Sequence, residues 1–499
     1  MLYEAFFCFF RERISLVVII LSNNSIDSCF AYIRNAFCDC SDFNSRRICF
    51  EDKKLAYLLN LGSYTDRDYI SESLIMPLIK HKVSPKKNDE IYGLFTSSEL
   101  SEISCTSVAI EKLLSGFAVL LIQTENDFSI FCAQVKRVAA RSVSEPDSEV
   151  VVKGPREGFI ENSEDNLALL RKRLKTTKFK SIRVTAGNYT DTTIYIAYVD
   201  SIADKNTVEN IKSTIENISI PGVIDSGYIE HFLSGHSPSL LKNAGVSEKP
   251  DVVAAKLLEG RVAIICDGSP GVITVPYLFI ESLQSAEDYL KTPLYATFMR
   301  FIRLVSLLLS LYFPSLYLAM VEHHTSVIPY KLYKTIITLR QDVPFGVFGE
   351  LLTVLFIFEL IREVGIRMPR AVGDAVGIVA GLILGDAAIS AGLASAPVIM
   401  VASLTAVCTF IIPDFMNSIV LIRFANLFLA KMFGFLGIIV SFVFIATTIC
   451  SHESFGIAFF SPFSPIKPKG LTDAVVTLPK RAIKHSTSAI YTKKDQNND

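Results

Sequence analysis

The sequence predicts an α/β (or α+β) region of two subdomains followed by an α-helical transmembrane bundle. Half of the 499 residues are hydrophobic and only 20% are charged, against about 25% in typical soluble domains. The mean hydropathy is +0.38, and the apolar excess lies mainly in long uncharged runs beyond residue 295. Ahead of these runs, helical and strand-like stretches alternate. We therefore expect a membrane protein with a large water-soluble half.

Changes in composition along the chain predict five divisions. The soluble half is expected to part into two subdomains near residues 141–147. The expected divisions are a variable N-terminal extension (1–50), subdomain 1 (51–145), α/β subdomain 2 (146–295), a bundle of five or six spans (296–450) and a basic C-terminal tail (451–499).

The N-terminal extension contains a short apolar run and half of the cysteines. Residues 14–21 are too few to cross a bilayer, which takes about 20 residues, and no signal-peptidase site follows them. A buried strand or helix is expected there instead. Cys29, Cys38, Cys40 and Cys49 lack the paired spacing of zinc ribbons. We therefore expect reduced thiols and no metal site.

Subdomain 2 has the clearest alternation of helical and strand-like segments. Gly-Asn at 187–188 and Asp-Gly-Ser-Pro-Gly at 267–271 are turn signals between β-rich runs. The expected helices are 165–175, 206–218 and 251–259, and the expected strands are 182–186, 193–199, 262–266 and 272–275.

The sequence shows no signature of catalysis or cofactor binding. It has no G-x-x-x-x-G-K-[ST] phosphate loop and no G-x-G-x-x-G after a strand. The histidines at 323–324 and 452 lack the spacing of a zinc protease helix. A net charge of −1 gives no reason to expect nucleic acid. We expect no enzyme activity, no cofactor, no metal and no nucleic-acid partner.

The first membrane span is expected at residues 301–321, with a bend at Pro314. Arg300 and Arg303 flank its N-terminal end, and Glu322 follows its C-terminal end. Because basic residues are retained on the cytoplasmic side of a membrane, the large N-terminal region is expected in the cytoplasm.

Further apolar segments follow, and basic residues separate some of them. Arg423 and Lys431 are expected to mark the cytoplasmic side between two spans. The expected apolar segments are 345–361, 372–393, 397–412 and 433–450.

The sequence does not decide whether the number of membrane spans is odd or even. Five spans would put the basic tail outside, against the positive-inside rule. Either 417–432 is a further span or 345–361 is re-entrant. The loop 326–342 is basic for an outer loop, which suggests that it lies along the membrane interface.

A row of glycines is the sharpest feature of the bundle. Gly373, Gly377, Gly381 and Gly385 repeat every four residues and share one face of a helix. Such a row permits close packing between helices. It also suits a helix that lines a pore, because small side chains leave room for water and ions. Both interpretations stay open here.

Two carboxylates on this segment favour the pore. Asp374 and Asp386 lie in apolar sequence, where an ionisable residue marks an ion path or a buried pair. Repeated around a symmetric oligomer, either would form a cation-selecting ring. They are about 120° apart on a helix of 3.6 residues per turn, so one of them is expected to face the lumen. Asp374 suits the cytoplasmic interface near Arg370 equally well.

Six sequence blocks together point to a known family. They are SEPDSEVVVKGPREGF (144–159), EKPDVVAAKLLEGRVAIICDGSP (248–270), FPSLY (313–317), VPF (343–345), EVGIRMPR (363–370) and SFGIAFFSPFSP (454–465). In this order they resemble the A subunit of spore germinant receptors, the GerA family. The resemblance covers roughly residues 50–485, and the first 50 residues match nothing in it.

The resemblance implies an integral protein of the spore inner membrane. Its implied partners are other copies of itself, membrane lipid, a transporter-like B subunit that binds the nutrient and a C-type lipoprotein. The implied function is a nutrient-gated cation channel formed by a ring of A subunits. Alternatives are an accessory germination channel of the same superfamily (SpoVAF-like) and a non-conducting receptor scaffold. Asp386 departs from the amide often found after Gly385 in the family, which bears on selectivity.

Overall fold

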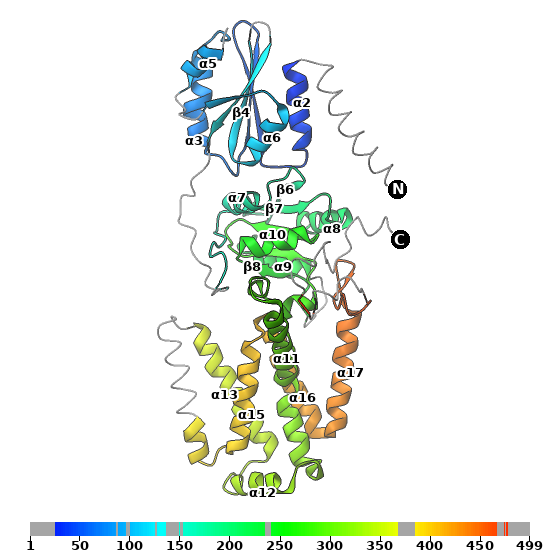
Figure 1. The fold of residues 1–499 in the computed structure, drawn as a ribbon. Coiled ribbons are helices and arrows are strands. Elements are labelled where there is room, and N and C mark those ends of the chain that lie inside the picture. Colours follow the sequence, from blue (N-terminus) through cyan, green and yellow to red (C-terminus); the bar gives the residue numbers. More distant parts are fainter. Residues whose placement is uncertain are drawn as a thin grey trace. The chain divides into compact units, whose positions relative to one another are not determined.

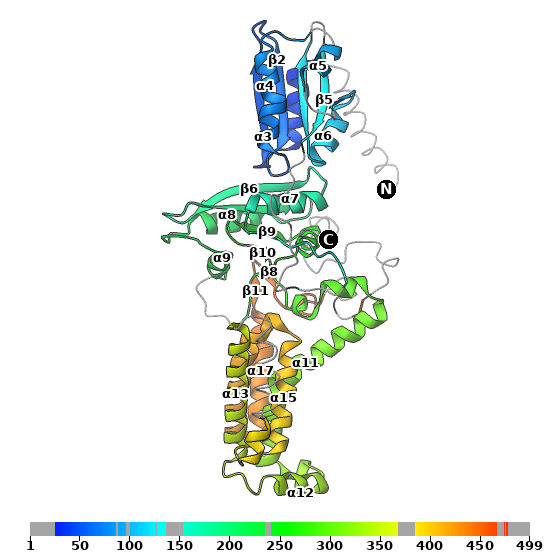
Figure 2. The same ribbon diagram turned by 90° about the vertical axis from the view of Figure 1, so that its left-hand side faces the viewer.

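The computed structural model describes residues 25–85, 88–95, 100–124, 127–135, 149, 153–234, 241–367, 385–466, 474, 476 and 477. The chain divides into two compact units. The first comprises Met1–Ser237, Ala244–Pro276 and Ile490–Asp499, and the second comprises Pro238–Asn243 and Tyr277–Ala489. Figures 1 and 2 show the elements of each unit.

The first unit begins with an antiparallel sheet of order β1-β2-β4-β5-β3. Because side chains alternate between the faces of a strand, Leu59 and Leu121 enter one core and Leu58 and Leu120 enter another. Both faces are therefore buried, which explains why β4 is apolar from Phe117 to Ile122 and why β2 is apolar except at Asn60. The strands are β1 (Phe43–Cys49), β2 (Leu55–Leu61), β3 (Leu100–Ile103), β4 (Phe117–Gln123) and β5 (Phe128–Gln134).

Helices cover both faces of this sheet. One core contains side chains of α2 (Ile26–Ala36) and α6 (Thr106–Leu114). The opposite core contains those of α3 (Arg67–Ile70), the π-helical turn η1 (Ser71–Ile75), α4 (Met76–Lys80) and α5 (Asn88–Leu94).

The structure differs from the predicted boundary of the N-terminal extension at residue 50. Ile26, Cys29 and Ile33 follow helical spacing and are buried on one face of α2, and β1 pairs along its whole length with β2. Residues 26–49 are thus part of the first sheet and its core. The predicted apolar run 14–21 lies outside the described residues.

The second sheet of this unit has the order β6-β7-β9-β10-β8, and every described pairing is antiparallel. Side chains of α7 and α10 share a core with β6, β7 and β9, while α8 and α9 contact β6, β7 and β10. The strands are β6 (Phe179–Ala186), β7 (Thr192–Val199), β8 (Gly245–Ser247), β9 (Val262–Cys266) and β10 (Val272–Val275). The helices are α7 (Ser163–Arg173), α8 (Lys205–Glu216), α9 (Ser226–Leu233) and α10 (Pro250–Leu258).

All three helices and four strands predicted for this region are confirmed, with small shifts at their ends. The predicted parting of the subdomains near 141–147 lies outside the described residues. It stays a prediction.

The second unit is a helical bundle preceded by two short 3-10 turns. Two of its helical segments, Pro293–Glu322 and Pro413–Phe433, are long and apolar enough to cross a membrane by length and composition. Ala396–Phe410 and Phe435–Ser451 are shorter apolar helices. The elements are η2 (Phe279–Leu283), η3 (Ala286–Leu290), α11 (Pro293–Glu322), η4 (Thr325–Val327), α12 (Tyr330–Leu339), α13 (Val347–Arg367), α15 (Ala396–Phe410), η5 (Pro413–Phe415), α16 (Met416–Phe433), α17 (Phe435–Ser451), β11 (Glu453–Ser454) and β12 (Ile457–Ala458).

The two ends of this bundle are called here the base and the tip. The base holds the start of α11 and the β11–β12 hairpin, because the backbone N–H of Tyr277 donates to Ser454 Oγ (3.2 Å) and that of Phe279 donates to the Phe459 carbonyl (2.9 Å). The tip holds the end of α11, where Lys431 Nζ lies 2.7 Å from Glu322 Oε2.

The chain passes between base and tip an even number of times. Helix α11 runs to the tip and α13 returns to the base (Figures 1 and 2). Ser395, just before α15, is again at the tip beside Glu350. Helix α15 then runs to the base, α16 to the tip and α17 back to the base. The described helices make five of these passages, and the residues after α17 lie at the same end as the start of α11.

Candidate functional site

The structure describes two of the six predicted pore residues. Gly373, Asp374, Gly377 and Gly381 fall outside the described residues. Gly385 and Asp386 begin a helical segment at residues 385–390, and the Asp386 side chain is exposed. A Cβ atom added at Gly385 would meet no atom within 4 Å.

Within the described bundle, charged side chains are buried between helices at two levels. At the tip, Glu350 in the first turn of α13 is fully buried. Arg340 donates to its Oε1 from Nε (3.0 Å) and Nη2 (2.8 Å). The backbone N–H and hydroxyl of Ser395 donate to Oε2 at 2.9 and 2.7 Å. Four donors therefore hold this carboxylate, which ties together the chain segments before α13 and α15.

Further along α13, Glu359 forms the centre of a second charged group. Its Oε1 accepts a hydrogen bond from Arg423 of α16, and its Oε2 lies 2.8 Å from Arg362 Nη2. The Arg423 side chain is only 2% exposed, and its Nη1 also donates to Thr409 Oγ1 at 3.2 Å. One carboxylate thus pairs with two guanidinium groups inside the bundle.

An uncharged polar contact joins helices α11, α16 and α17. Asn426 of α16 donates to the Leu311 carbonyl of α11 at 3.1 Å and accepts from the Ser441 hydroxyl of α17. The contact fixes α16 between its neighbours.

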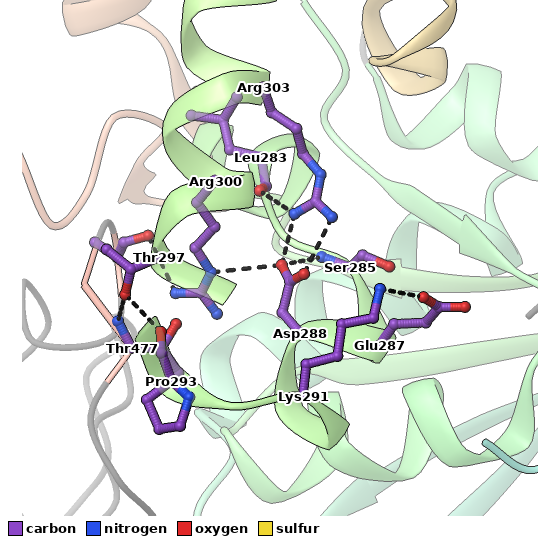
Figure 3. A network of polar contacts seen from close by, with 11 residues as sticks. Leu283, Ser285, Glu287, Asp288, Lys291, Pro293, Thr297, Arg300, Arg303 and Thr477 are labelled. Carbon is purple, nitrogen blue, oxygen red and sulfur yellow. Dashed lines mark hydrogen bonds and ion pairs between the residues drawn. The ribbon is translucent and has the colours of Figure 1, made fainter. Parts of the chain in front are cut away.

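The base of the bundle carries a third group of charges, shown in Figure 3. Asp288 in η3 is 1% exposed and accepts two hydrogen bonds from Arg303, at 2.6 and 3.0 Å. Arg300 Nε lies 3.5 Å from the same carboxylate, and the Ser285 N–H donates to it at 3.1 Å. The two arginines that were predicted to flank the first span are therefore both paired with one aspartate.

The same network attaches the C-terminal segment. Arg300 Nη1 donates to the Ala474 carbonyl at 3.3 Å, and the Thr477 N–H donates to Thr297 Oγ1 at 3.1 Å. Figure 3 shows Thr297 of α11 facing Thr477. The tail thus contacts the first turns of α11 at the base.

The structure gives new information on the positions of Arg423 and Lys431. Arg423 was expected to mark the cytoplasmic flank of a span, yet it is buried in the middle of α16 beside Glu359. Lys431 lies at the tip and pairs with Glu322, which was expected on the outer side. Arg423 therefore lies within a helix and not between two helices, whereas the side of the membrane on which Lys431 lies stays a prediction.

The first unit contains a polar pocket where its two sheets meet. Its volume is about 90 Å³, and buried Asp42 forms part of its wall. Arg171 of α7 binds Asp42 through Nε (2.6 Å) and Nη2 (2.5 Å). The pocket is lined by Ser41, Asp42, Asn44, Gly62, Ser63, Arg67, Glu164, Arg183 and Tyr195.

The Asp42 carboxylate is held in its charged form. Burial alone would raise its pKa, but the charge and the hydrogen bonds of Arg171, helped by the Ser63 hydroxyl, hold the pKa of Asp42 below its usual value. The pair bridges residues that are 129 positions apart in sequence. It therefore joins the two sheets of the first unit.

The cysteines of residues 29–49 are divided between the core and the surface of the first unit. Cys29 and Cys40 are buried, whereas Cys38 and Cys49 are exposed. Among the residues that the structure describes, no three His, Cys, Asp or Glu side chains are placed to hold a metal ion.

Sequence comparisons place this chain among known proteins. The family model described as Bacillus/Clostridium GerA spore germination protein matches residues 31–489. Spore germination protein KA of Bacillus subtilis is 33% identical over 85% of this chain and 78% of its own length. Spore germination protein A1 of the same organism is 31% identical over 85% of this chain and 87% of its length.

Two further similarities concern a membrane protein and a solved structure. The uncharacterized membrane protein YfkQ of Bacillus subtilis is 34% identical over 88% of this chain and 86% of its length. The crystal structure of the N-terminal domain of the A subunit of the Bacillus megaterium spore germinant receptor GerK3 matches with a TM-score of 0.39 and 23% identity, over 52% of this chain and 96% of that domain. With a family model that matches nearly its whole length, the chain belongs to the GerA family of spore germination proteins.

Proposed function

We propose that this chain is the channel-forming subunit of a nutrient-responsive germinant receptor in the spore inner membrane. Membership of the GerA family supports a role in germination. The observation that carries the membrane part of the proposal is the distribution of charge in the bundle. Glu350, Glu359 and Arg423 are directed inward and paired, while apolar side chains such as Leu436 and Phe444 are largely exposed. Such a bundle suits lipid outside and polar groups inside.

In this proposal the bundle crosses the membrane six times: with the five described helices α11, α13, α15, α16 and α17, and with the span expected at 372–393. The large N-terminal region and the tail would then share the cytoplasmic side. An even number removes the conflict between the basic tail and the positive-inside rule, and it makes residues 417–432 a span.

The conducting path is proposed along the segment from Gly373 to Asp386. The small-residue face of Gly377, Gly381 and Gly385 would line the pore of a homo-oligomer, and Asp386 would supply a ring of carboxylates that favours cations. Exposure of Asp386 in the isolated chain is compatible with this role, because a pore forms only when several copies assemble.

Gating would come from partner subunits. A B-type membrane subunit would bind the nutrient, and a C-type lipoprotein would complete the receptor. Nutrient binding would shift a closed–open equilibrium only through a difference in affinity for the two states. An accessory germination channel of the same superfamily, without its own nutrient sensor, is the second candidate.

Potassium efflux from vegetative cells tests this proposal. The chain would be expressed with and without its B and C partners, as wild type, Gly381→Leu and Asp386→Asn. Nutrient-dependent efflux that is blocked or locked open by Gly381→Leu and changed in ion selectivity by Asp386→Asn is the expected result. Gly365→Leu, at an α13 glycine around which an added Cβ meets nothing within 4 Å, is the matched control.

Two other outcomes of the efflux experiment would favour different functions. Efflux that ignores nutrient would favour the accessory channel. Absence of efflux, with the assembled complex verified in the membrane, would identify a non-conducting scaffold.

A further inference from the structure

Helix α12 lies across the end of the bundle at its tip (Figures 1 and 2). We propose that α12 is an amphipathic helix that lies on the membrane surface at the tip and binds anionic phospholipid. The proposal rests on the membrane-spanning role given to the bundle above, and it adds a surface and a ligand to that role.

One end of α12 is fixed to the bundle. Arg340, directly after the helix, is held by the buried carboxylate of Glu350. Ile336 is the only described residue of α12 that is buried, and the helix contacts α15. These contacts define which face of α12 is turned toward the bundle.

Apolar side chains flank that buried face on both sides. At 100° per residue, Leu332 and Leu339 lie to one side of Ile336, and Tyr330 and Ile337 lie to the other. All four are exposed, by 53, 49, 78 and 44% respectively. An isolated bundle in water would leave these side chains solvated, whereas a helix lying in the interfacial plane would bury them among acyl chains.

The face opposite Ile336 is cationic. Lys331, Lys334 and Thr338 lie about 140–160° from Ile336 around the helix, and all three are exposed. Among the described residues, neither lysine has a carboxylate within ion-pair distance. Asp342, the acidic residue of the 326–342 loop, lies beyond the helix. The lysines thus sit at the level where phosphate groups would meet them, since long basic side chains extend from the interface toward headgroups.

The combination of two apolar flanks and a cationic outer face on α12 fits a lipid surface better than a protein partner. A protein that covered both apolar flanks would have to wrap around α12 against the bundle, whereas lipid already surrounds the bundle on all sides. The direction of the charge also agrees, because the cations point away from the bundle end and toward the headgroup layer.

Tryptophan fluorescence offers a direct test, since the chain contains no tryptophan. Single substitutions Leu332→Trp and Thr338→Trp would be placed in the full chain and reconstituted into phosphatidylcholine bilayers with phosphatidylglycerol. Lipids brominated on the acyl chain quench an indole that lies among them. Leu332→Trp is expected to be quenched several-fold more strongly than Thr338→Trp, with emission shifted to shorter wavelength.

The charge of the lipid is tested in the same samples. Brominated phosphatidylglycerol is expected to quench Leu332→Trp more strongly than brominated phosphatidylcholine at equal mole fraction. The difference should vanish when Lys331→Gln and Lys334→Gln are added. Equal quenching by the two lipids in the parent would overturn anionic lipid binding.

Failure of this proposal can be told apart from failure of the membrane assignment. If alkaline carbonate releases the chain from membranes, the spanning bundle itself is wrong. If the chain is retained but Leu332→Trp is reached by aqueous acrylamide and not by bromine, α12 is not on the lipid. Protection from both quenchers would show that protein covers it, most simply a second copy, and would overturn the lipid proposal.

Discussion

At the scale of single residues, the folded chain depends on charges that are buried with few partners. Asp42 and Arg171 are 7% and 1% exposed, and each would be an uncompensated charge without the other. Removing one partner of such a pair is much more destabilising than replacing both by apolar groups. The pair therefore contributes more to the specificity of the contact between the two sheets than to net stability.

Asp42→Asn is expected to destabilise the first unit by about 3–5 kcal/mol, because Arg171 would stay buried without its counter-charge. Thermal unfolding of the purified chain, followed by circular dichroism, measures the change. Arg67→Leu is the matched control, since Arg67 pairs with Glu164 between the same two sheets but is 65% exposed. Its effect should stay below about 1 kcal/mol. Equal shifts in the two variants would contradict the argument.

The same pair predicts a direction of pH dependence. The folded pKa of Asp42 is below its usual value of 3.8, so the unfolded chain binds the proton more readily. The stabilisation is complete above the usual carboxyl pKa and is lost as the pH falls through the lower, folded pKa. Lowering the pH should therefore destabilise Asp42→Asn less than it destabilises the wild type.

At the scale of elements, α13 and α16 are joined by an asymmetric group of charges. Glu359 pairs with both Arg362 and Arg423. If Arg423 is removed, Glu359 keeps Arg362 as its partner. If Glu359 is removed, two guanidinium groups lose theirs. The carboxylate should therefore matter more than either arginine.

Glu359→Gln is expected to destabilise the detergent-solubilised bundle by about 3–5 kcal/mol, as for a broken buried pair. Arg423→Leu should have a clearly smaller effect. The fraction of monodisperse protein that survives heating, measured by size-exclusion chromatography, ranks the variants. A larger loss for Arg423→Leu than for Glu359→Gln would refute the asymmetry.

Elements were predictable from sequence where local signals were strong. Val262–Cys266 and Val272–Val275 match their strands because a dense turn signal separates two β-rich runs. Helix α2 was missed, since its few apolar residues are spaced across a segment that also carries four polar residues and a cysteine. Arg423 was misplaced because sequence alone cannot tell a charge at the end of a span from one paired inside it. Its partner Glu359 is 64 residues away.

At the scale of the whole molecule, the parity of the bundle follows from contacts between distant segments. The hairpin after α17 binds Tyr277 and Phe279, and Ala474 and Thr477 bind the first turns of α11. Neither contact has a local sequence signal, which is why the number of spans could not be decided from hydropathy. If the bundle spans the membrane, the start of α11 and the hairpin after α17 must lie on one side of it.

Reporter fusions test this topology in a bacterial host. Green fluorescent protein is fluorescent when it is retained in the cytoplasm, and alkaline phosphatase is active only after export. Fusions before Met1 and after Asp499 are both expected to fluoresce, because six passages return the chain to its starting side. An alkaline phosphatase inserted after Ser326, at the tip, should be active and serves as the internal control for the outer side. A phosphatase that is active after Asp499, with the Ser326 insertion also active, would require an odd number of spans. It would then follow that the contact between residues 474–477 and α11 does not form in the membrane.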